Sequence, residues 1–342
     1  MTTAGEKFER VLEGHFACSR GLLTAIECLG HSYSSQTANY DLSVSLPTLP
    51  EDWQKGRLDP PTWSHSRSRS PDGDGDFADD KFEWGMTVGF HVEPNGTQSP
   101  DFARILRWRF QTAVTTTNYA ADFFSVRARV VREIEVWWDA ISLWIAVFTK
   151  QDMVEIGKTR SGIRVGPIIT WSGDKDGLRA NGSIDKSRPV VSDQVDVLDH
   201  RTLTACMALT ASKTEPPLGW LLIRDARSLV TARQYRRAVI DACTAAEVSL
   251  TSLIDDKFDA DGTPEADRRS QFASHHGISR LKQLHRAVGA EGTLPTRLVE
   301  DVGALRNKAA HRGYEPTPAE TGLAIDTATA VVELATPLAS LR

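Results

Sequence analysis

Residues 300–311, with the sequence EDVGALRNKAAH, combine an apolar stripe with a polar edge in one short pattern. Four apolar residues recur at spacings of four, three and four, starting just before this stretch: Leu298, Val302, Leu305 and Ala309. This spacing places them on one side of a helix, where they can face a core. The stretch therefore predicts an amphipathic helix, and Arg312-Gly313 supplies the cation and the flexible residue that end it.

The polar edge of this helix carries an arginine, an asparagine and a histidine. Asn307 and His311 are four residues apart and share one face, and Arg306 lies about 100° round the helix from Asn307. A guanidinium binds phosphate oxygens and stays charged, and an imidazole can give or take a proton near neutral pH. These groups suit a phosphodiester substrate. No carboxylate or second histidine lies at ligand spacing, so we predict neither a metal nor a cofactor.

The sequence RNKAAH, from Arg306 to His311, resembles the signature of the HEPN superfamily. In that signature an arginine and a histidine are separated by four to six residues, and an asparagine often follows the arginine. The motif alone leaves open a simpler interpretation, in which a helix end carries a solvated arginine and histidine.

Helical periodicity extends over residues 214–342, which we predict to be an all-α bundle. One helix carries Leu218 to Leu229, a second begins near Gln234, a polar loop spans residues 255–264, a third helix ends at Gly289, and the last opens with the capping box of residues 317–320 (TPAE). The resemblance implies the same architecture, since HEPN domains are small helical bundles with the motif on a late helix.

The helix at residues 235–247 (YRRAVIDACTAAE) is similar to the first long helix of many HEPN members, including an acidic residue near its middle. Glu247 lies at the flank of an apolar stripe, where a carboxylate needs a partner. Arg306 or Asn307 is the expected partner. The alternative is a surface glutamate that pairs with nothing.

The resemblance also implies an activity, because catalytic HEPN members are metal-independent endoribonucleases that usually act as dimers. His311 would then move the proton of the 2′-hydroxyl or of the leaving group, Arg306 would stabilise charge on the phosphate, and Asn307 would orient either one. The product would carry a 2′,3′-cyclic phosphate. Gly303 and Ala310 would allow the motif helices of two copies to approach closely, which predicts a homodimer.

Two functions from different classes follow. The first is a ribonuclease effector of a toxin–antitoxin or phage-defence system, acting on RNA such as tRNA. An antitoxin or a trigger ligand would then bind its N-terminal domain. The second is a non-catalytic HEPN-like module for dimerisation or scaffolding, or one that binds a nucleotide through Arg306.

Residues 1–200 predict an α+β domain without a recognisable family, and Pro216-Pro217 marks a boundary after it. Apolar residues at spacings of three or four predict a long core helix over residues 122–148. Residues 82–92 and 102–114 favour strands. Within the second, Arg107-Trp108-Arg109-Phe110 alternates, as in a half-buried strand or in a platform for nucleic acid.

Residues 54–82 are rich in Pro, Ser, Asp and Gly, which predicts an exposed flexible loop. Its acidic end resembles a calcium loop but has Phe77 where the turn needs glycine, so a solvated acidic loop is the better interpretation.

The composition is that of a globular chain with a net charge of −5, which excludes a wholesale electrostatic affinity for RNA. The cysteines have no paired spacing, and the sequence shows neither a signal-peptide pattern nor a membrane span. We therefore expect a cytoplasmic protein without a membrane partner.

Overall fold

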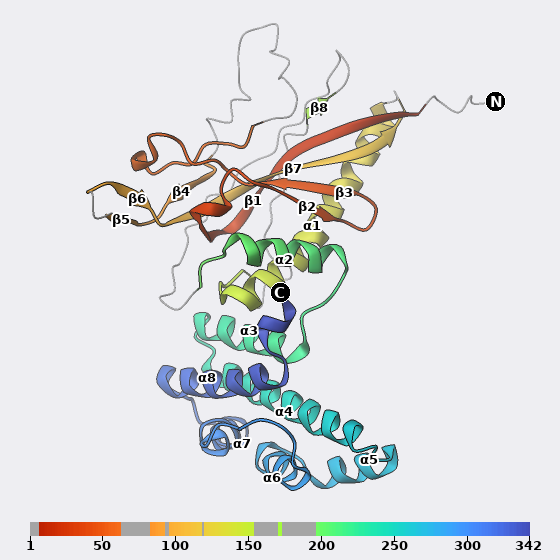
Figure 1. Cartoon of the computed structure of the whole chain (residues 1–342), viewed down its shortest axis with the longest axis vertical. Helices are drawn as coiled ribbons and strands as arrows, with labels where there is room; N and C mark the ends of the chain where they lie inside the picture. Colours follow the sequence, from red (N-terminus) through yellow and green to blue (C-terminus); the bar gives the residue numbers. More distant parts are fainter. Residues whose placement is uncertain (1–6, 63–82, 93–95, 118–119, 154–169, 173–195) are drawn as a thin grey trace, which may run out of the picture. The chain divides into compact units, whose positions relative to one another are not determined.

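The computed structural model describes the chain except residues 1–6, 63–82, 93–95, 118–119, 154–169 and 173–195 (Figure 1). The chain divides into two compact units, one built from Met1–Met153 with Thr159–Glu215 and the other mainly from Pro216–Arg342. The first is α+β and the second is entirely helical in its described residues, which confirms the predicted fold class.

The first unit is organised around two long antiparallel strands, β1 and β7. They lie in a sheet with the order β2-β3-β7-β1-β8, and β4 also pairs with β7. The strands of this sheet are β1 (Phe8–Ala25), β2 (Ser32–Gln36), β3 (Asp41–Ser45), β4 (Gly85–Thr87), β7 (Phe102–Thr116) and β8 (Thr170–Ser172). A separate hairpin joins β5 (Phe90–Val92) to β6 (Gln98–Pro100), and the short helices η1 (Ile26–Cys28) and η2 (Trp53–Lys55) lie in connections.

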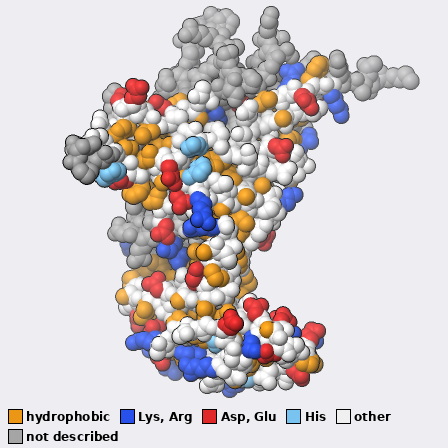
Figure 2. All heavy atoms as spheres, viewed as in Figure 1, with side chains coloured by type: hydrophobic (Ala, Val, Ile, Leu, Met, Phe, Trp, Pro, Cys, Tyr) orange, Lys and Arg blue, Asp and Glu red, His pale blue; other side chains and the backbone are white. Residues whose placement is uncertain are grey.

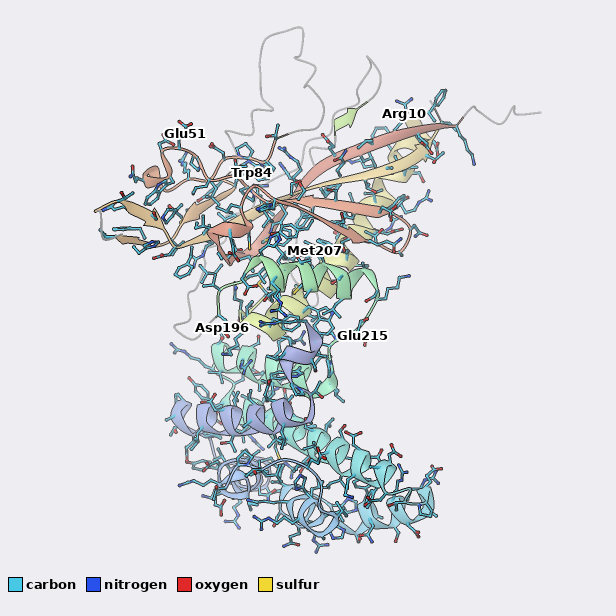
Figure 3. All side chains as sticks on the ribbon, viewed as in Figure 1. Arg10, Glu51, Trp84, Asp196, Met207 and Glu215 are labelled. Carbon is cyan, nitrogen blue, oxygen red and sulfur yellow. The ribbon has the colours of Figure 1, made fainter. Side chains whose placement is uncertain are left out.

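Two helices pack on one face of this sheet. The helix α1 (Ala120–Thr149) buries its predicted apolar stripe, and Trp138 makes edge contacts with Phe16 of β1 and Trp108 of β7. The helix α2 (His200–Ala211) carries Met207, labelled in Figure 3, whose carbonyl accepts a hydrogen bond from Ser35 of β2. Apolar burial against α1 therefore fixes which face of the sheet is the core.

The opposite face carries the arginines of the alternating segment in β7. Arg107 is 5% exposed and Arg109 is 3% exposed, and the guanidinium of Arg109 lies over the ring of Trp84. His15, opposite Arg109 on β1, contacts the edge of Trp84 (labelled in Figure 3), and burial lowers its pKa to about 3. Both faces of this segment are buried, so neither a half-buried strand nor an exposed nucleic-acid platform describes it.

The second unit is a helical bundle. Its elements are α3 (Leu218–Thr231), α4 (Tyr235–Ala260), α5 (Glu265–Ser274), α6 (Ile278–Val288), the π-helical turn η4 (Val299–Ala304), α7 (Leu305–His311), α8 (Pro318–Ala335) and η5 (Leu338–Leu341). The capping box at Thr317 and Glu320 and the end of the third predicted helix at Gly289 are both confirmed, and Gly289 adopts a left-handed conformation after α6. These local signals depend on backbone chemistry within a few residues.

The predicted polar loop at residues 255–264 is wrong. The helix α4 continues to Ala260 and α5 starts at Glu265, so only a short turn separates them. Phe258 is buried near the end of α4, and the ring of Phe272 in α5 packs edge-on against it. Aspartate is a poor helix former, so contacts distant from this segment hold it helical: the packing of Phe258 against Phe272, and the ion pairs of Arg268 in α5 with Asp255 and Asp259.

The predicted loop at residues 54–82 is only partly described. Its first residues pair with neighbouring segments through the backbone, since isolated antiparallel β-bridges join Asp59 to Thr48 and Arg57 to Met86. The acidic run that resembles a calcium loop, residues 72–77, lies outside the described residues. Of the helices that the structure describes, none is both long enough and apolar enough to cross a bilayer.

Candidate active site

The motif helix lies between α4 and α8. Leu305 of α7 packs with Val239 of α4 and Ala324 of α8, and the whole predicted stripe from Leu298 to Ala309 is buried. The segment is not one regular helix, because η4 makes a π-helical turn before α7 begins. Such turns are frequent at functional sites. The residues of the motif itself all lie in the regular part.

Arg306, Asn307 and His311 lie away from the core stripe. Arg306 is half-buried, whereas Asn307 and His311 are exposed. The Nη1 atom of Arg306 donates a hydrogen bond to Oδ1 of Asn307 at 3.2 Å. By the helical period, Arg306 and His311 point in directions about 140° apart, with Asn307 between them. The three side chains therefore span an outward arc of α7 rather than converging on one point.

The Arg306 side of this arc faces α4. The thiol of Cys243 lies 3.8 Å from Oε1 of Glu247, and burial raises the pKa of Cys243 to about 12. The charge of Glu247 also raises this pKa, and the charge of Arg306 lowers it, so both side chains lie near the thiol. In the part of the chain that the structure describes, Glu247 makes no ion pair with Arg306 or hydrogen bond with Asn307.

The other side of the arc faces the start of α8. Glu320 there accepts hydrogen bonds from the backbone and side chain of Thr317 and from the hydroxyl of Tyr314, and these bonds lower its pKa. The charge of Lys308 contributes to the same shift, which places Lys308 on this side. The motif helix ends as predicted, since Gly313 adopts a φ of 64°.

The small residues of the motif helix serve packing within the chain. A Cβ atom on Gly303 would lie 3.3 Å from Cβ of Ile278 in α6, so the glycine allows a close contact inside the bundle. This contact differs from the predicted role of Gly303 between two copies. Ala310 is half-buried, and its carbonyl accepts a hydrogen bond from Nη2 of Arg236 at 3.3 Å.

Arg236 is a neighbour of the motif that the sequence reasoning missed. It lies within residues 235–247, the stretch that resembles the HEPN family, but in that stretch only Glu247 was predicted to support the site. No signal in the sequence marked Arg236, because its approach to Ala310 depends on how α4 and α7 pack together. Figure 2 shows basic side chains gathered over α6 and α7.

Among the described residues, no group of three or more His, Cys, Asp or Glu side chains is arranged to hold a metal ion. Compared with known proteins, the chain matches no family model, no curated protein and no solved structure.

Proposed function

We propose that this protein is a metal-independent endoribonuclease whose site is formed by Arg306, Asn307 and His311. The observation that carries the proposal is the separation of faces on α7. The apolar stripe holds the helix in the bundle, and the three polar side chains lie on the arc turned away from it. An exposed imidazole and a guanidinium on the outward arc of one helix supply the two groups that phosphodiester cleavage needs.

The reaction uses the 2′-hydroxyl of the RNA as nucleophile. Its oxygen attacks the phosphorus, the bond to the 5′-oxygen breaks, and the products are a 2′,3′-cyclic phosphate and a 5′-hydroxyl. His311 accepts the 2′-proton or donates one to the leaving oxygen. Arg306 binds the non-bridging oxygens as their charge grows. Asn307, held by Arg306, lies between the two and positions the phosphate or the imidazole.

One histidine cannot serve as base and acid in the same step, which supports a homodimer. Arg306 and His311 point about 140° apart, so a single α7 does not bring its own arginine and histidine to one point. A second copy packed against that arc adds its own histidine and arginine to one cleft. Glu247 serves as a supporting residue near Arg306 through their shared neighbour, Cys243.

We place this activity in an effector of the toxin–antitoxin or phage-defence type, with tRNA as a candidate substrate. The α+β unit, which is a separate compact unit of the chain, is the proposed receiver of an antitoxin or a trigger ligand.

The test is cleavage of total RNA and purified tRNA by the full chain in excess chelator. We expect Arg306→Ala and His311→Ala each to reduce the rate by at least about 100-fold, the lower end of the contribution of general acid–base groups. Lys308→Ala is the matched control, because Lys308 is exposed on the same helix but lies toward Glu320. The proposal is wrong if the wild type cleaves and His311→Ala cleaves equally fast.

If neither wild type nor variant cleaves any RNA, the alternative gains support. The motif helix would then serve a non-catalytic HEPN-like module for dimerisation, scaffolding or nucleotide binding. Binding of a labelled nucleotide, lost in Arg306→Ala, would identify the last of these.

A further inference from the structure

Arg236 lies beside the proposed site although it belongs to another helix. It is the second residue of α4, its side chain is exposed, and its guanidinium donates a hydrogen bond to the carbonyl of Ala310. Ala310 directly precedes His311. The bond therefore holds the guanidinium at the end of α7 that carries the proposed general acid–base.

The two helices run antiparallel, which sets the spacing of the arginines. Arg236 bonds to the carbonyl of Ala310, and Cys243, about two turns further along α4, lies near enough to Arg306 to feel its charge. Arg306 and Ala310 are four residues apart on α7, which is about 6 Å along the axis. Arg236 and Arg306 thus both lie on the α4 side of α7, near backbone positions that are about one turn apart.

A guanidinium has five N–H donors, and one bond to a carbonyl leaves the others able to bind phosphate oxygens. Successive phosphates of an extended RNA strand can bridge a separation of this size. We propose that Arg236 binds the phosphate next to the scissile one, so that the site takes a single-stranded RNA segment with at least two phosphates. This inference rests on the proposed function of Arg306 and His311.

Arg236 also has a purely structural explanation, because a cation near a helix C-terminus stabilises the last carbonyls. The two explanations predict different measurements. A structural cation affects the free energy of unfolding. A phosphate contact changes how RNA binding depends on salt, since each contact releases counterions from the nucleic acid.

The neighbouring Arg237 provides a matched control. It has the same side chain, is also exposed and lies in the same turn of α4. Its Nη1 atom, however, donates to Oε1 of Gln234 at 2.7 Å, within its own helix. Loss of Arg237 removes the same charge from the molecule without removing a group from the end of α7.

The experiment measures binding of a fluorescein-labelled single-stranded RNA to the full chain by anisotropy at several NaCl concentrations. His311→Ala is the background, so that the probe is not cleaved. We expect adding Arg236→Ala to weaken binding about tenfold, as for one charged hydrogen bond. The slope of log K against log[salt] should fall by about 0.7. Arg237→Ala should leave the slope unchanged, and Arg236→Lys should restore it.

Equal slopes for Arg236→Ala and Arg237→Ala would overturn the inference, even if Arg236→Ala lowered the melting temperature. Absence of RNA binding in the parent at low salt would overturn it as well. Cleavage by the wild type is scored separately. A protein that binds RNA through Arg236 without cleaving it would refute the proposed activity and leave this contact standing.

Discussion

Replacing Leu305 by alanine tests the assignment of faces on α7 most severely. Leu305 is 7% exposed and packs between Val239 of α4 and Ala324 of α8. Truncation removes its buried methyl groups and leaves a cavity, and the short side chain of Ala324 cannot extend to fill it. Leucine-to-alanine changes of this kind cost about 2–5 kcal/mol, a large part of the roughly 5–15 kcal/mol that holds a domain folded.

The comparison variant is His311→Ala, six residues further along the same helix. Its side chain is exposed and lies off the core stripe, so the change in the free energy of unfolding should stay within about 0.5 kcal/mol. Equilibrium unfolding in urea, followed by circular dichroism at a helix wavelength, measures both.

The reasoning is refuted if Leu305→Ala costs less than about 1 kcal/mol, below the range for a buried leucine. It is equally refuted if His311→Ala destabilises the bundle as much as Leu305→Ala does. In the second case His311 would be a structural residue, and loss of cleavage in that variant would say nothing about chemistry.

Two further predictions concern the bundle. Thr317→Ala removes the hydroxyl that caps α8, and we expect thermal unfolding to show a loss of about 0.5–2 kcal/mol in the free energy of unfolding. The control is Thr244→Ala, which should change this free energy little, because the Thr244 hydroxyl donates to a carbonyl of its own helix, α4. Burial raises the pKa of the Cys243 thiol from its usual value of 9.0 to about 12, so the folded state holds the thiol proton more tightly than the unfolded state. The free energy of unfolding therefore falls as pH rises from 9 to 12, because the unfolded state loses this proton first. Melting temperatures over that range should fall less steeply for Cys243→Ala than for the wild type, and parallel curves would contradict the assigned burial.

Periodicity was enough to predict the parts of the fold that bury a continuous stripe. The apolar residues of α1 and those from Leu298 to Ala309 are buried as expected, because a helix in a core must repeat its apolar contacts every three or four residues. The capping box of α8 was equally visible, since it depends on two side chains three residues apart. Signals of this kind are local.

The segments that sequence reasoning missed depend on contacts that are distant in sequence. The helix α5 has no buried residue in its own right and is anchored by Phe272 against Phe258, so it presents no stripe to detect. Gly303 was assigned to a dimer contact, whereas its space is taken by Ile278 of α6. Which helix passes closest to a glycine is a property of the tertiary fold.

The candidate site shows the same division. The outward arc of Arg306, Asn307 and His311 followed from spacing within one helix. The approach of Arg236 to Ala310 did not, because it requires α4 and α7 to be antiparallel and in a particular register. Nor did the position of Glu247, which lies near the thiol of Cys243 rather than in an ion pair with Arg306.

The central claim is that His311 promotes attack by a 2′-hydroxyl of RNA. The most direct measurement uses an RNA whose cleavage position has been mapped, paired with an RNA that carries one 2′-deoxynucleotide on the 5′ side of that bond. Both are incubated with the wild type in excess chelator. We predict cleavage of the first, with a 2′,3′-cyclic phosphate end, and an intact bond in the second. Cleavage of both at the same position would contradict the account, since the nucleophile would then not be the 2′-hydroxyl.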